Sequence, residues 1–189
     1  MIIGKKLVKN LLKILLVIVV FYIVFYTLML SSCSETNHSS SEADYETMIN
    51  EVRGASDHMP DIEKLGAYQN ISINRKTTRY LLWGIDTISV SVYYSENDFT
   101  EEIKKISESY SFVNENSEHL HDISATIDTC TVKIVDKEQK TYSNYYPKCF
   151  MMIGTNYERK SITYMYHYDI DLDEIDNLDS FIEKYYLFN

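Results

Sequence analysis

The feature that most constrains this chain is an uninterrupted apolar run near its beginning. Ile14 to Leu30 contains no charged residue over 17 positions, and it ends before Glu35, the first acidic residue of the chain. Together with the leucines just before it, the run approaches the ~20 residues that a helix needs to span the hydrocarbon core of a bilayer. It is apolar on every side, whereas a helix on the surface of a soluble domain keeps a polar face. The sequence therefore predicts a membrane segment followed by a separate soluble domain.

Basic residues flank only one end of this run. Four lysines precede it, and no Lys or Arg follows it before Arg53. Because loops rich in Lys and Arg stay on the cytoplasmic side of a membrane, the N-terminus is expected in the cytoplasm. Residues from 34 onward are then expected at the cell membrane, facing the extracellular side.

Two interpretations remain open for the end of the membrane segment. Leu30-Ser31-Ser32-Cys33 matches a bacterial lipobox, in which cleavage before Cys33 leaves a diacylated cysteine as the first residue of the mature protein. The alternative is an uncleaved signal anchor, because the run exceeds the roughly 7–15 apolar residues of a signal peptide. We favour the lipoprotein, with Cys33 as the lipidation site. Both interpretations place the same domain on the same side.

The chain is expected to divide into three parts. Residues 1–33 form the anchor or signal, residues 34–43 a polar tether, and residues 44–189 one extracytoplasmic domain. After the anchor, 14 basic residues stand against 28 acidic ones, a net charge of about −14. This acidity argues against a nucleic-acid partner, because phosphates require Lys and Arg. Its simplest role is solubility.

Two cysteines remain outside the anchor, Cys130 and Cys149. Exported chains fold in an oxidising environment, where two such cysteines most often pair. Neither has a partner at the spacing of a metal site, and neither lies beside a histidine that would activate a thiol. We therefore predict a Cys130–Cys149 disulfide, which stabilises the fold by roughly 3 kcal/mol on the chain-entropy estimate.

The apolar pattern of the domain predicts an α+β fold, with an antiparallel sheet of about five to six strands and helices packed on one face. The clearest strand is 86–94, where Ile88, Val90 and Val92 alternate with Thr and Ser, so that one face is buried and one is wet. The other predicted strand regions are a hairpin over 69–83 that turns at 74–77, a strand pair or one long bent strand within 123–135, and a hairpin of 148–154 with 161–168. Amphipathic helices are expected over 44–53, 98–110 and 173–186.

Signals for catalysis or metal binding are sparse. His119 and His121 form an H-x-H pair that, with nearby acids, could ligate zinc, although no third ligand follows at a suitable spacing. The acids at alternate positions from Asp169 to Asp173 resemble the start of a calcium loop, but the expected glycine is replaced by Glu174. We favour a solvated connector for the first and a strand end before a helix for the second. No catalytic residue, metal site or cofactor is assigned.

Tyrosine is the one residue type in clear excess, with 17 in the chain. Tyr142, Tyr145 and Tyr146 fall in a predicted loop, and further tyrosines lie in the following hairpin. Such side chains supply a large contact area at low entropy cost and suit the binding of a cell-surface protein or glycan. The favoured alternative is that Tyr serves as a strand residue on a half-buried sheet.

The segment Met59-Pro60-Asp61-Ile62-Glu63-Lys64-Leu65-Gly66-Ala67-Tyr68, together with the anchor, resembles uncharacterised membrane-anchored or lipoprotein-type proteins of low-GC Gram-positive bacteria. The resemblance implies no activity and no functional residue. We therefore expect a membrane-tethered extracytoplasmic binding domain without catalytic activity, in contact with the membrane through residues 14–30 or a lipidated Cys33. The alternative is a small exported metal-dependent or hydrolytic enzyme that uses His119 and His121.

Overall fold

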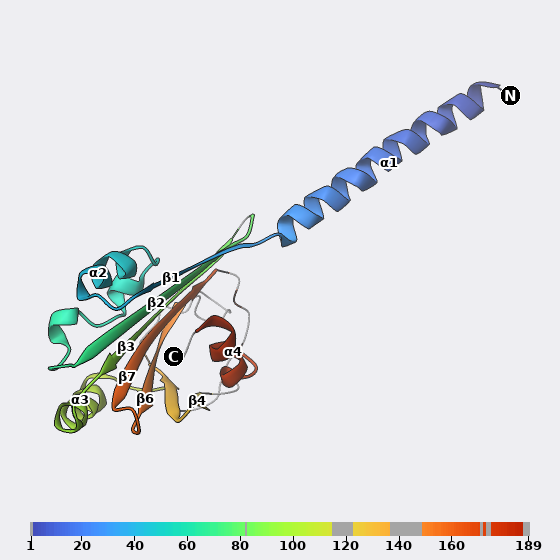
Figure 1. Ribbon diagram of the computed structural model, residues 1–189. Helices are drawn as coiled ribbons and strands as arrows, with labels where there is room; N and C mark the ends of the chain where they lie inside the picture. The colour runs from blue at the N-terminus through green and yellow to red at the C-terminus, as the bar shows by residue number, and fades with distance from the viewer. Residues whose placement is uncertain are drawn as a thin grey trace.

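The apolar run forms a long helix that projects from the rest of the chain (Figure 1). The computed structural model of the protein describes residues 2–81, 83–114, 123–136, 149–170, 172 and 175–186. Helix α1 spans Ile2–Leu30, and its stretch Asn10–Met29 has a mean hydropathy of 2.7 with none of it buried against the domain. By length and composition this helix could anchor the chain in a membrane or serve as a signal sequence.

The described residues form one antiparallel sheet of seven strands in the order β1-β2-β3-β7-β6-β5-β4. The strands are β1 (Cys33–Ser39), β2 (Asn70–Arg79), β3 (Gly84–Tyr93), β4 (Ser124–Ile127), β5 (Cys130–Ile134), β6 (Cys149–Asn156) and β7 (Ser161–Asp169). This confirms the predicted α+β class with an antiparallel sheet, and the strand count is slightly higher than the five to six expected. The predicted strand pair within 123–135 is β4–β5, and the hairpin of 148–154 with 161–168 is β6–β7.

The extra strand is β1, which occupies most of the segment predicted to be a tether. It pairs with β2 from Cys33 opposite Arg79 to Ser39 opposite Ile73. Its side chains are mostly exposed, so the strand carries no apolar alternation that would identify it from sequence. The prediction of a free tether over 34–43 is therefore wrong for residues 34–39, and only Ser31 and Ser32 separate α1 from the sheet.

Strand β2 is also longer than predicted. The polar residues 74–77, expected to turn, continue the strand because β1 and β3 pair with it on either side. Their polar groups find partners there: Asn74 Oδ1 lies 2.8 Å from His38 Nδ1, and Thr77 Oγ1 donates to Asp86 Oδ1 at 2.9 Å. The chain reverses between Tyr80 and Trp83 instead.

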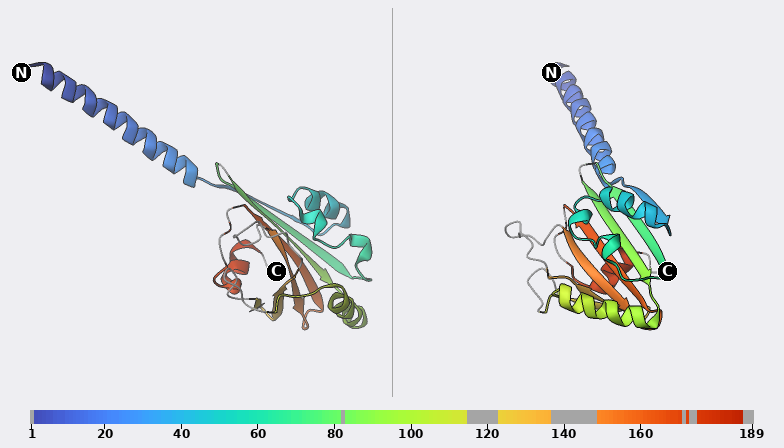
Figure 2. Two further views of the ribbon diagram at one scale, coloured as in Figure 1. Left: turned by 180° about the vertical axis from the view of Figure 1, so that it is seen from behind. Right: turned by 90° about the vertical axis from the view of Figure 1, so that its left-hand side faces the viewer.

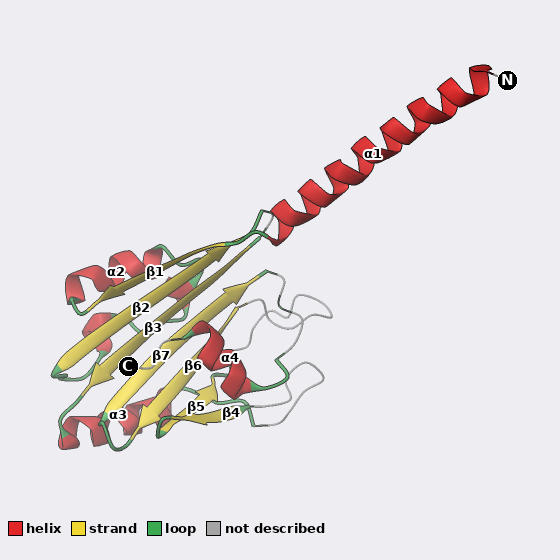
Figure 3. Ribbon diagram, turned by 45° about the vertical axis from the view of Figure 1, so that its right-hand side comes forward, coloured by secondary structure: helices red, strands yellow, loops and turns green. Residues whose placement is uncertain are grey.

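Helices cover both faces of the sheet (Figures 2 and 3). On one face lie α2 (Glu42–Asn50), the 3-10 turns η1 (Ala55–Asp57) and η2 (Ile62–Lys64), and α3 (Glu96–Ser109). On the other face lies α4 (Leu178–Tyr185). Met151 and Ile153 join the core under α2 and α3, while Phe150 and Met152 join the core under α4. The prediction of helices on one face only is therefore wrong, because the central strands bury both sets of alternating side chains.

The predicted helices exist, with shifted starts. Helix α3 begins at Glu96, two residues before the predicted range 98–110, since Ser95 is its N-cap and the Ser95 Oγ accepts a hydrogen bond from the Asp98 N–H at 3.3 Å. Helix α4 begins after Asn177, whose Oδ1 accepts from the Ser180 N–H at 2.8 Å. Polar side chains that accept from free backbone N–H groups thus set both N-termini.

The predicted Cys130–Cys149 disulfide does not form. Strands β5 and β6 are neighbours, but Cys130 lies opposite Asn156 while Cys149 starts β6 at its other end. The seven residue steps from Cys149 to Asn156 span about 23 Å at ~3.3 Å per residue. Disulfides require Cα atoms within roughly 7 Å. Cys33, Cys130 and Cys149 are accordingly all free thiols.

Candidate functional site

Two hollows open on the face that carries α2 and α3, one on each side of the segment 55–65. The first, which we call the α2 cleft, lies between α2 and η2 and has a volume of about 360 Å³. The second, the α3 cleft, lies between η2 and α3 and has a volume of about 380 Å³. Both volumes fall in the range of about 300–1,000 Å³ typical of small-ligand sites.

A tight turn after α2 places this segment over the sheet. Gly54 has a φ of +75°, a conformation that side-chain-bearing residues rarely adopt. A Cβ atom added at Gly54 would lie 2.8 Å from the Tyr166 hydroxyl, which itself donates a hydrogen bond to the Arg53 carbonyl at 2.9 Å. The His58 Nδ1 lies 2.9 Å from the Gly54 carbonyl. The turn is thus tied to β7 and directs the chain back across α2.

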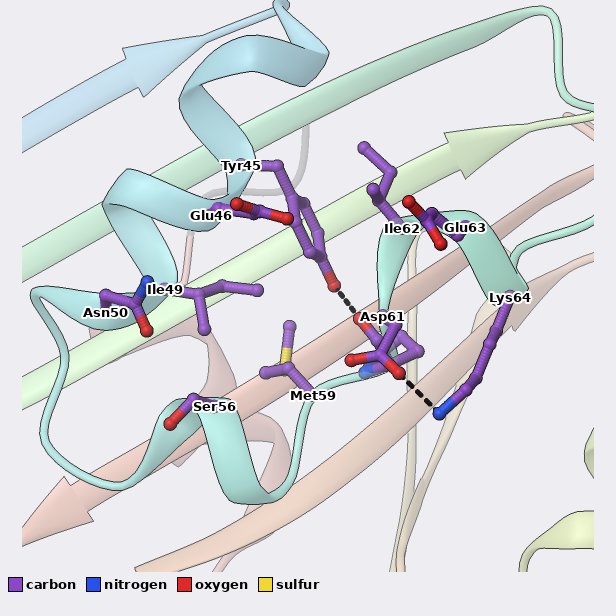
Figure 4. Close-up of a pocket in the computed structure, with 11 residues that line it drawn as sticks. Tyr45, Glu46, Ile49, Asn50, Ser56, Met59, Asp61, Ile62, Glu63 and Lys64 are labelled. Atoms are coloured by element: carbon purple, nitrogen blue, oxygen red, sulfur yellow. Dashed lines mark hydrogen bonds and ion pairs between the residues drawn. The ribbon is translucent and has the colours of Figure 1, made fainter.

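The α2 cleft combines an apolar floor with a charged rim (Figure 4). Tyr45 and Ile49 of α2 face Met59, and the Tyr45 hydroxyl donates to the Pro60 carbonyl, which joins α2 to the crossing segment. The rim carries three carboxylates and one ammonium group: Glu46, Asp61, Glu63 and Lys64. Lys64 is paired with Asp61. The rim therefore keeps a net negative charge with two carboxylates outside that pair.

The α3 cleft is organised around a buried carboxylate. Glu102 is 4% exposed, and its Oε2 accepts from Lys105 Nζ at 2.9 Å and from the Gly66 N–H at 3.2 Å. These two donors compensate the desolvation of the carboxylate. They also tie the end of the crossing segment to α3. Because both donors are already engaged, Glu102 serves the structure of the cleft.

The tyrosines around the clefts keep their protons at neutral pH. Burial raises the pKa of Tyr45 and Tyr164 well above the ordinary value, and nearby phenols and carboxylates add to the effect. Burial, followed by a hydrogen bond with Glu42, raises the pKa of Tyr68 to about 12. These hydroxyls can donate hydrogen bonds, but they are poor candidates for a general base.

Few of the described residues could bind a metal ion or act as a nucleophile. They contain no group of three or more His, Cys, Asp or Glu side chains that could hold a metal ion. Burial raises the pKa of the Cys130 thiol to about 11, so it stays protonated and unreactive at neutral pH. His119 and His121 lie outside the described residues, and the predicted metal-dependent alternative therefore stays a prediction.

Only some of the tyrosines that the sequence grouped together lie among the described residues. Tyr142, Tyr145 and Tyr146 lie outside the described residues, and the binding role predicted for them remains untested. Tyr164 and Tyr166 are each 1% exposed and belong to the core under α2 and α3. They match the alternative in which Tyr fills the sheet, so a patch that includes them is excluded.

The residues of the α2 cleft were not predicted as a site. Tyr45 and Ile49 carry the helical spacing of α2, which indicates only a buried face. The signal that could have found the other cleft residues is the pair Pro60 and Gly66, which brackets a short acidic segment without the periodicity of a helix or strand.

No protein-family model, no curated protein and no solved structure matches the chain. Its function is therefore inferred from the residues of the site.

Proposed function

We propose that this chain is a membrane-tethered extracytoplasmic binding domain without catalytic activity. The chain is held at the membrane either by α1 as an uncleaved anchor or, after cleavage has removed α1, by a lipid on Cys33, and the α2 cleft receives a positively charged group of the partner. The observation that carries the proposal is the combination of an apolar floor with a rim of three carboxylates and one lysine.

This combination favours one kind of ligand. An apolar floor accepts the methylene stem of a Lys or Arg side chain, and rim carboxylates accept hydrogen bonds from its charged end. Of the two partner classes that the sequence suggested, a cell-surface protein with exposed basic side chains fits this rim better than a neutral glycan. The volume of about 360 Å³ suits one such side chain with its neighbours rather than a whole folded surface.

Removal of the rim charges is expected to weaken binding of an oligolysine peptide to the full chain in detergent. In the triple variant Glu46→Gln, Asp61→Asn, Glu63→Gln we expect a loss of about tenfold, since three exposed contacts at ~0.5 kcal/mol each sum to about 1.5 kcal/mol. Isothermal titration calorimetry measures the change. The control Glu101→Gln, Glu108→Gln, Glu183→Gln removes the same charge from exposed sites on α3 and α4. Equal loss in both variants would mean non-specific attraction and would refute the cleft as the binding site.

A further inference from the structure

We propose that the β2–β3 hairpin tip, defined here by Tyr80, Leu81 and Trp83, inserts into the headgroup layer of the bilayer that holds α1. This inference rests on the proposed membrane tether and goes beyond it, because it makes the tip a second membrane contact that fixes how the domain stands on the surface. The occupant of this surface is the lipid bilayer itself.

The connection between helix and sheet brings the tip to the membrane. Helix α1 ends at Leu30 and β1 begins at Cys33, so at most about 11 Å of chain separates them at ~3.3–3.6 Å per residue. The headgroup layer on each side of a bilayer is about 5–8 Å thick. Cys33 therefore lies near the outer edge of this layer when α1 spans the hydrocarbon core. Lipidation of Cys33 would bring the same point at least as close.

The register of the sheet places the hairpin tip beyond Cys33, on the side of the sheet where α1 ends. Cys33 lies opposite Arg79, the last residue of β2, and Arg79 lies opposite Gly84, the first residue of β3. Because β1 runs away from α1 and β2 runs antiparallel to it, the residues after Arg79 extend back toward the helix. Figure 1 shows the hairpin beside the end of α1. The tip is thus level with the residues that leave the membrane.

The side chains at this end suit a membrane interface. The rings of Tyr80 and Trp83 stack with centroids 5.0 Å apart, and Leu81 is 54% exposed. Outside α1, the described residues include three large hydrophobic side chains that are exposed, and two of them, Leu81 and Ile170, lie at this end of the sheet. Tyr and Trp concentrate where the bilayer meets water, because one end of each ring system is apolar and the other can stay hydrated.

Two arginines also lie at this end of the acidic domain, beside the carboxylate of Asp86. Arg79 pairs with Asp86 at 2.9 Å, and the Arg53 guanidinium lies 5.1 Å from the Tyr168 ring centroid and donates to its hydroxyl at 2.9 Å. Both arginines line a hollow of about 320 Å³ together with Tyr80 and Trp83. Guanidinium groups beside interfacial aromatic rings can meet lipid phosphates.

Trp83 makes the inference directly measurable, because it is the only tryptophan of the chain. The full chain is reconstituted into phosphatidylcholine–phosphatidylglycerol vesicles that contain lipids brominated at a chosen acyl position. We expect a blue-shifted Trp83 emission that bromines near the glycerol end reduce roughly by half, as for an indole at the interface. Bromines near the methyl end are expected to quench less. Leu81→Asp is expected to abolish the quenching.

The control moves the tryptophan to the far end of the sheet. In Trp83→Phe, Tyr157→Trp the fluorophore sits in the β6–β7 turn, at a position that is 59% exposed, and no quenching is expected although the anchor is unchanged. Vesicle flotation reports the anchor separately. A chain that floats but shows Trp83 unquenched would overturn the hairpin inference and leave the tether standing. A chain that does not float would overturn the tether and the hairpin inference with it.

Discussion

Replacement of His167 by Met is expected to make the domain more stable, and increasingly so as the pH falls. The imidazole is 0% exposed and lies against Phe150, Phe181 and Tyr185, with ring centroids 5.4, 4.7 and 4.9 Å away. Neither ring nitrogen has a hydrogen-bond partner among the described residues. Burial, followed by the charge of Lys184, lowers the pKa of His167 to about 3.

This lowered pKa makes His167 destabilising in acid. In the unfolded chain a histidine has a pKa of about 6.5, so between that value and about 3 the unfolded state binds one proton more than the folded state. The free energy of unfolding therefore falls by about 1.4 kcal/mol per pH unit as the pH drops through this window. Between pH ~6.5 and pH ~5 the loss is about 2 kcal/mol. Above pH ~6.5 the effect of His167 on the free energy of unfolding no longer changes with pH.

Urea unfolding of the full chain in detergent at several pH values measures the effect. His167→Met should remove the slope and also raise the stability at neutral pH by about 1–3 kcal/mol, because a polar group without a partner is no longer buried. Phe181→Met is the matched control, since it alters the same packing without removing a titratable group, and it should keep the wild-type slope. An unchanged slope in His167→Met would show that the imidazole is not buried as described.

Truncation of Phe150 is the second change with a large expected effect. Phe150 is 1% exposed, and its ring centroid lies 5.6 Å from that of Phe181 in α4. We expect Phe150→Ala to lower the free energy of unfolding by about 3–5 kcal/mol, as for other buried phenylalanines. This is a large share of the ~5–15 kcal/mol that stabilises a typical domain.

The same variant tests whether both faces of the sheet are covered. If helices packed on one face only, Phe150 would face water and its truncation would change the stability by no more than about 0.5 kcal/mol. Tyr157→Ala provides this reference, because Tyr157 is 59% exposed. Equal melting temperatures for Phe150→Ala and Tyr157→Ala would mean that α4 does not cover the second face.

The sequence predicted those elements that their own side chains identify. Strand β3, in which apolar residues alternate with Thr and Ser, and the β6–β7 hairpin, which is rich in apolar and aromatic residues, both lie close to their predicted bounds. The second face of the sheet was missed because small hydroxyl residues occupy part of it. Thr87 and Ser89 are polar but only 2% and 3% exposed, and Thr87 Oγ1 donates to the Lys76 carbonyl at 3.2 Å. Sequence alone does not distinguish such buried hydroxyl groups from solvent-exposed ones.

Features set by tertiary contacts escaped prediction. Strand β1 exists because β2 offers it a partner edge, since its own side chains are polar and mostly exposed. The separation of Cys130 and Cys149 follows from the register of β5 against β6, which spacing along the chain does not reveal. The α2 cleft needs the crossing segment held by the Tyr45 hydroxyl and by the Gly54 turn. These contacts join residues that lie far apart along the chain, so the helical or strand periodicity of a single element does not reveal them.

The central proposal is that α1 or a lipid on Cys33 holds the domain at the outer face of the membrane. The most direct test is labelling with a membrane-impermeant maleimide, using Thr100→Cys on exposed α3 in a chain whose Cys149 is replaced by Ser and whose Cys33 is kept as the candidate lipidation site. The same chain without Thr100→Cys is the blank. Cys130, at 4% exposure, stays protected in the folded domain. We predict that intact bacterial cells label position 100 and that the labelled chain sediments with the membrane fraction. Labelling only after the cells are lysed, or a labelled chain in the soluble fraction, would contradict the account.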